Sequence, residues 1–162
     1  MPLYYRYGQV EAALAEVFKV GANELGALRG RLRHLRNIGV PALPNPGSGR
    51  QIRYSREAAI EMLLALELAG LGIAPRHAAT YAKAYAKPIA SGAFDDWADG
   101  ILMTMDNPFG LGKETTSQQN IRRWFNFIST FEGGIPRCFA IINTKRSVEV
   151  LDEALNGEQR NT

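Results

Sequence analysis

The chain has 162 residues, of which 46% are hydrophobic and 22% are charged, and its formal net charge is +3. These values are ordinary for a globular protein of one domain or two small ones, and no apolar run approaches the roughly 18 residues of a membrane span. A single cysteine, Cys138, and two histidines leave little material for a disulfide or a metal site. We therefore expect no metal, no cofactor, no membrane contact and a cytoplasmic location.

Positive charge is concentrated in one segment. Between Leu25 and Arg56 there are seven arginines and no aspartate or glutamate, so the rest of the chain carries a net charge of −4. The arginines are Arg29, Arg31, Arg33, Arg36, Arg50, Arg53 and Arg56. A compact block of one sign favours binding to a polyanion, most simply nucleic acid.

Two helices are predicted before and within this block. Apolar residues at three-to-four-residue spacing predict a helix over Val10 to Phe18, and Gly21 suits its end. Asn23 suits the N-cap of a second helix, which we expect from about Glu24 to Asn37, with Pro41 preventing its continuation. Two helices of this size joined by a short turn form a helix-turn-helix.

The next segment has the pattern of a β-hairpin. Pro41 to Pro46 is extended, Pro46-Gly47-Ser48-Gly49 is a turn, and Gln51 to Tyr54 has the branched and aromatic content of a short strand. We expect the two arms to pair, with Arg50 at the tip. A basic hairpin that follows a helix-turn-helix is a wing.

Two further helices complete the expected amino-terminal domain, which spans residues 1–87. Ser55 suits the cap of a helix that ends at Gly70 or Gly72. Pro75 suits the first position of another helix, which runs to Lys87, where Pro88 stops it.

Residues 88–162 are expected to form a small α/β region that mediates dimerisation or receives a signal. The expected elements are a short helix at 94–97, a strand at 101–105, a loop at 107–117, a helix at 121–131, a strand at 138–142 and a last helix bearing Val148, Leu151 and Leu155. The predicted fold is therefore mainly α, a winged helix-turn-helix followed by this segment.

One face of the second helix is suited to a major groove. The face opposite its leucine stripe comprises Asn23, Ala27, Gly30, Arg33, His34 and Asn37. Ala27 and Gly30 allow close approach, Arg33 and His34 can read base edges, and the flanking arginines are placed for phosphates. A solvated amphipathic helix is the alternative, but no acidic residue offsets the arginines at i+3 or i+4. The expected DNA-contacting residues are Asn23, Arg29, Arg31, Arg33, His34, Arg36, Asn37, Ser48, Arg50, Arg53 and Tyr54.

Over about residues 8–87 the chain resembles the DNA-binding domain of MerR-type winged helix-turn-helix regulators. The order of five markers carries the resemblance: Arg33, Gly39, Gly49, Tyr54-Ser55 and Gly72-Ile73. It implies that Arg33 is the recognition-helix arginine and that Arg50 and Arg53 contact the flanking backbone or minor groove. It also implies that Tyr54 lies near a phosphate, although a core tyrosine is an equal alternative.

The chain departs from that family in three respects. The wing is about a residue longer, paired sensor cysteines are missing, and Pro88 and Gly92 interrupt the family's long dimerisation helix. Metal or thiol sensing and promoter untwisting are therefore not carried over from the resemblance.

The sequence predicts a nucleoid-associated, sequence-specific regulator of transcription that binds double-stranded DNA, of a kind also found in prophages. We expect a homodimer, because one helix and one wing read few bases. RNA polymerase is a further candidate partner. Two alternatives stay open: an excisionase-like factor that bends DNA, and a protein–protein module such as an antitoxin or polymerase-binding factor. We expect no enzyme, because no nucleophile is paired with a base.

Overall fold

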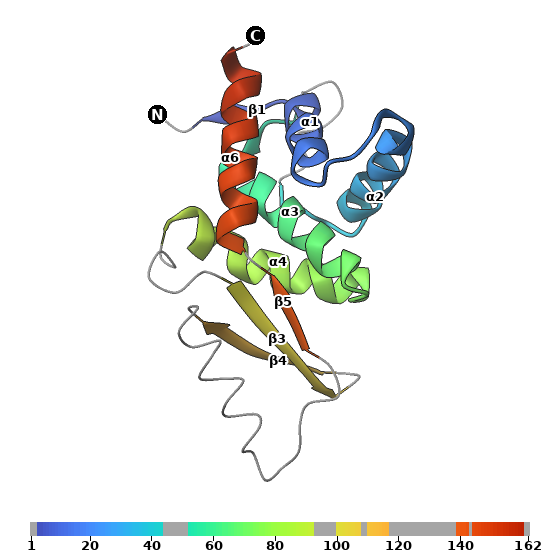
Figure 1. The fold of residues 1–162 in the computed structure, drawn as a ribbon, viewed down its shortest axis with the longest axis vertical. Helices are drawn as coiled ribbons and strands as arrows, with labels where there is room; N and C mark the ends of the chain where they lie inside the picture. The colour runs from blue at the N-terminus through green and yellow to red at the C-terminus, as the bar shows by residue number, and fades with distance from the viewer. Residues whose placement is uncertain are drawn as a thin grey trace. The chain divides into compact units, whose positions relative to one another are not determined.

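The computed structural model describes residues 3–43, 52–92, 100–107, 110–116, 139–142 and 144–160, and helices dominate them (Figure 1). The chain divides into two compact units, one formed by Met1–Ala93 with Ser147–Thr162 and the other by Phe94–Arg146. This division differs from the expected boundary near residue 87 because the last helix joins the first unit.

The first unit is built from helices and two very short strands. In chain order these are β1 (Tyr4–Tyr5), α1 (Tyr7–Val17), the 3-10 turn η1 (Ala22–Glu24), α2 (Leu25–Asn37), β2 (Tyr54–Ser55), α3 (Arg56–Gly70), α4 (Pro75–Ala90) and most of α6 (Thr144–Arg160). Helix α3 is the centre of the core, since every residue from Ala58 to Leu66 is buried. A helix that is apolar on nearly all sides has to be covered by its neighbours.

The connection between α1 and α2 differs from the prediction. Lys19, at φ 52°, takes the left-handed conformation that ends the helix, whereas Gly21, the residue we expected to end it, has φ −70°. Asn23 is not the N-cap of α2, because it lies inside η1. The Glu24 carboxylate instead accepts the Gly21 N–H at 3.2 Å, so a longer side chain caps this turn.

The ends of the later helices follow the predictions with one exception. The Ser55 hydroxyl accepts the Ala58 N–H at 3.1 Å and caps α3, and Pro75 is the first residue of α4. Pro88 does not stop α4, which continues to Ala90. The backbone carbonyl that Pro88 leaves without an N–H belongs to Ala84, an exposed residue, so water can hydrate it.

The predicted wing is only partly described. Its turn, including Ser48 and Arg50, lies outside the described residues. In the second arm, Tyr54 and Ser55 pair antiparallel with Tyr5 and Tyr4, a partner that the sequence did not indicate. In the first arm, the Ala42 N–H bonds to Glu61 and the Leu43 N–H to the Pro41 carbonyl, so neither joins a ladder with the second arm.

Helix α6 is fastened to the first unit by polar contacts. Arg56 makes a bidentate pair with Asp152, at 2.8 Å for both bonds, and also donates to the Ala90 carbonyl at 2.6 Å. Ser147 donates to the Glu67 carboxylate of α3. Burial raises the pKa of Glu67 above its ordinary value, and the bond from Ser147 opposes part of that rise. Arg56, although part of the arginine block, therefore joins three helices of the protein's own fold.

The second unit contains a three-stranded antiparallel sheet in the order β4-β3-β5, with β3 in the middle (Figure 1). Strands β3 (Gly100–Asn107) and β5 (Phe139–Ile142) fall where strands are predicted. The predicted loop at 107–117 is wrong, because β4 (Gly110–Thr116) pairs with β3 from Gly100↔Thr116 onwards. Glycines and polar residues hide this strand from a hydrophobicity pattern, and its partner strand supplies the hydrogen bonds. The predicted helices at 94–97 and 121–131, and Cys138, lie outside the described residues.

Candidate nucleic-acid interface

The outward face of α2 is open to solvent. Leu28, Leu32 and Leu35 are buried, Leu32 completely, and hold the helix on the core. All residues of the predicted groove face are exposed: Asn23, Ala27, Gly30, Arg33, His34 and Asn37. No described part of the chain covers this face, so it is accessible to a partner.

The arginines that border this face have different surroundings. Arg31 and Arg33 are exposed, and neither forms an ion pair among the described residues. Arg29 Nε lies 2.7 Å from Glu11 Oε1 of α1, with the Arg29 side chain 59% exposed and that of Glu11 12% exposed. Arg29 has no acidic residue at i+3 or i+4 in its own helix, so its partner comes from α1. This ion pair connects α2 to α1.

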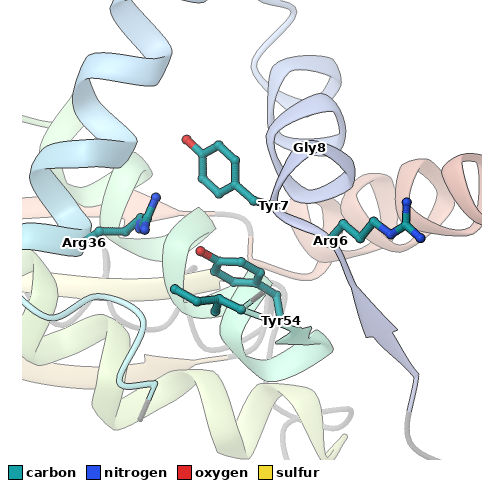
Figure 2. A pocket seen from close by; sticks show the side chains of 6 residues that line it. Arg6, Tyr7, Gly8, Arg36 and Tyr54 are labelled. Carbon is teal, nitrogen blue, oxygen red and sulfur yellow. The ribbon is translucent and has the colours of Figure 1, made fainter. Parts of the chain in front are cut away.

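Arg36 lies at a hollow of about 370 Å³ between α1, the end of α2 and the second arm of the predicted wing. The hollow is lined by Arg6, Tyr7, Gly8, Arg36, Ile52 and Tyr54. Arg36 Cζ is 5.3 Å from the centre of the Tyr7 ring, which is a cation–π distance. Figure 2 shows the hydroxyl groups of Tyr7 and Tyr54 directed towards the Arg36 side of the hollow, while Arg6 extends the other way.

Tyr54 is a core residue in this structure. It is 1% exposed, and its ring packs against that of Tyr7 with the ring centres 6.1 Å apart. Burial raises the pKa of Tyr54, and Arg36 opposes that shift. Of the two roles considered for Tyr54, that of a core tyrosine fits this burial better than a position beside a phosphate. Arg53, the preceding residue, is exposed.

Arg6 and Tyr7 were missed by the sequence analysis because they precede the arginine block by about 20 residues. The signal available was the run Tyr4-Tyr5-Arg6-Tyr7, which mixes aromatic and basic residues. The pairing of β1 with β2 is what brings this run to the wing.

No protein-family model matches the chain, and no curated protein matches its sequence.

Two further findings concern the described residues only. They contain no group of three or more His, Cys, Asp or Glu side chains that could hold a metal ion. None of their helices is long and apolar enough to cross a membrane.

Glu61 anchors the chain just beyond α2. This carboxyl group is 6% exposed and lies in the most apolar stretch of α3. Its Oε2 accepts the Ala42 N–H at 3.3 Å, whereas its Oε1 is buried with no hydrogen-bond partner among the described residues. Burial raises the pKa of Glu61 above the ordinary 4.5, while the Ala42 bond and Lys83 oppose the rise and Glu57 adds to it.

This raised pKa predicts a pH effect that Glu61→Gln removes. The folded protein holds the Glu61 proton more tightly than the unfolded chain does, so this residue's contribution to stability is largest below about pH 4.5 and is lost as pH rises through the raised pKa. As pH rises through the raised pKa of Glu61, we expect the free energy of unfolding of Glu61→Gln to increase relative to that of the unsubstituted protein. Urea denaturation at a series of pH values measures it.

The comparison isolates Glu61 because Glu67, whose pKa is shifted in the same direction, is present in both proteins. Glutamine keeps an oxygen that can accept the Ala42 N–H, so the anchor itself is retained. A difference between the two proteins that stays constant with pH would show that burial does not hinder ionisation of Glu61.

Proposed function

We propose that this chain is a sequence-specific regulator of transcription that binds duplex DNA through a winged helix-turn-helix similar to that of MerR-type proteins. Helix α2 would lie in the major groove, with Arg33, His34 and Asn37, together with Asn23 of the preceding turn, facing base edges. The wing, with Ser48, Arg50 and Arg53, would contact the flanking backbone or minor groove. Two copies on an inverted repeat would supply the selectivity that one helix lacks.

The observation that carries the proposal is the exposed side of α2, a helix whose charged residues are all cationic. The leucines on its apolar side are buried in the core. Its outward side has small residues in the middle, and beside them Arg31 and Arg33 form no ion pair among the described residues. On a helix that only faces water, an acidic residue one turn from an arginine would stabilise the helix, and α2 contains no acidic residue. A groove of matching width and opposite charge accounts for both features.

The hollow beside Tyr7 places the end of α2 next to the second arm of the predicted wing. Arg36 from α2 and Ile52 and Tyr54 from the second arm line the same space, and Glu61 ties the first arm to α3. These contacts hold the end of α2 and the described parts of both arms of the predicted wing on the core of the first unit. Such connection is what a two-part DNA reader needs, because the two parts have to match neighbouring grooves.

Selection of duplexes from a random pool tests the proposal. We expect enrichment of a short inverted repeat and an affinity that falls steeply with salt. Large bends with a ladder of complexes and no common sequence would favour the architectural alternative. Indifference to duplex DNA at low salt would contradict DNA binding and favour a protein partner.

A further inference from the structure

A second basic stripe lies on α4 and contains none of the expected DNA-contacting residues. Its exposed cationic residues Arg76, Lys83 and Lys87 are spaced by seven and four positions, which places them on one side of the helix. Thr80 and Ala84 are exposed next to them, whereas Ala78, Ala82 and Tyr85 on the opposite side are buried. The stripe is therefore a solvent-facing row of charge.

Helix α4 shares a composition with α2 that the other described α-helices lack. Neither α2 nor α4 contains an aspartate or a glutamate, whereas α1, α3 and α6 each contain at least two acidic residues. Helices that merely face water gain a few tenths of a kcal/mol from each pair of opposite charges one turn apart. Helices α2 and α4 contain no such pairs, so their exposed sides favour contact with an anionic surface.

Lys83 of α4 lies close to the chain just beyond the end of α2. Gly39, at φ 80°, is the second residue after α2, and a Cβ atom placed there would lie 3.7 Å from Lys83 Nζ. Lys83 also faces the Glu61 carboxyl group, whose pKa it lowers, so part of its charge is used within the fold. Arg76 and Lys87, on either side of Lys83, extend the charge away from this junction.

We infer that the α4 stripe contacts phosphates of the same duplex beyond the segment held by α2 and the wing. This inference rests on the proposed function. At 1.5 Å per residue, Arg76 and Lys87 are about 16 Å apart along the helix, so they would reach separate phosphates. The contacts are sequence-independent, because they reach the backbone and not the base edges.

The double variant Arg76→Gln/Lys87→Gln tests the inference. Lys83 is kept because it faces Glu61. On mixed-sequence duplex DNA, the slope of log affinity against log salt is expected to become shallower by about 2, close to 0.9 for each phosphate that is no longer neutralised. Fluorescence anisotropy titrations at several salt concentrations measure this slope, and the base preference found by selection is expected to stay unchanged.

The matched control is Lys19→Asn/Lys145→Gln, which removes the same charge from two exposed lysines, one in the turn after α1 and one on α6. Asparagine is chosen for position 19 because φ there is 52°. An unchanged slope in the α4 variant overturns the inference and leaves the stripe to a different partner, such as an acidic protein surface. An equal decrease in the control also overturns it, because bulk charge then explains the effect.

Two more measurements separate other failures. If the double variant does not show the melting transition of the unsubstituted protein, Lys87→Gln alone is used, with an expected slope change of about 0.9. If the unsubstituted protein binds no duplex, the proposed function fails and the inference fails with it. Normal binding with an unaltered slope in the variants removes only the inference.

Discussion

Replacing Arg33 with alanine is expected to weaken binding to the selected duplex by about 1–3 kcal/mol, roughly 5- to 150-fold, and to relax the base preference. Arg33 is exposed at the middle of the outward face of α2 and has no ion-pair partner among the described residues. Its guanidinium group is therefore free to make the bidentate contact that arginine makes with guanine. Titrations with the selected duplex and with a mixed-sequence duplex measure the change.

Arg31→Ala is the matched control for Arg33. Arg31 lies two residues earlier on the same helix, is equally exposed, and sits at the border of the face and not at its centre. We expect it to weaken both duplexes alike and to reduce the salt slope by about 0.9, the value for one phosphate that is no longer neutralised. If Arg33→Ala also weakened both duplexes alike, Arg33 would be a backbone contact and another residue would have to read the bases.

Leu151→Ala is expected to destabilise the first unit by about 2–5 kcal/mol, the usual cost of a large cavity in a core. Leu151 lies on α6, some 60 residues beyond α4, yet its side chain is 0% exposed and α6 is fastened to α3 through Arg56 and Asp152. Amide hydrogen exchange of α3 provides the measurement, because it reports the opening of the first unit alone.

The exposed residue Glu153 of the same helix supplies the comparison. Glu153→Ala is expected to change the stability by no more than about 0.5 kcal/mol, since it removes no buried contact. Exchange rates in α3 that are the same in Leu151→Ala and the unsubstituted protein would mean that α6 does not complete the core of the first unit.

The elements and the open face of α2 could be predicted from local patterns. Leucines at helical spacing, Gly39 at a helix end, Ser55 as a cap and Pro75 at a first position each act within a few residues, so the sequence shows them directly. Strand β4 was not predicted, because its glycines and polar residues have no alternating pattern and its hydrogen bonds come from β3.

The roles of individual arginines could not be predicted in the same way. Arg29 and Arg56 belong to one uninterrupted basic block, but the first pairs with Glu11 and the second with Asp152, 96 residues away. The negative net charge of the rest of the chain indicates that acidic residues are available to pair with the arginine block. It does not indicate which of them lie close to the block in space. Ion pairs depend on side chains within about 4 Å in space, and separation along the chain does not set that distance.

The sequence by itself determined that one helix would bury a leucine stripe and turn arginines outward, because side-chain direction follows from helical periodicity alone. Only the tertiary structure decided that β1 pairs with β2, that Glu61 holds the chain after α2, and that the last helix completes the first core. Each of these is a contact between distant segments. Burial of apolar surface and hydrogen bonding between these segments select such contacts, and no local pattern of residues encodes them.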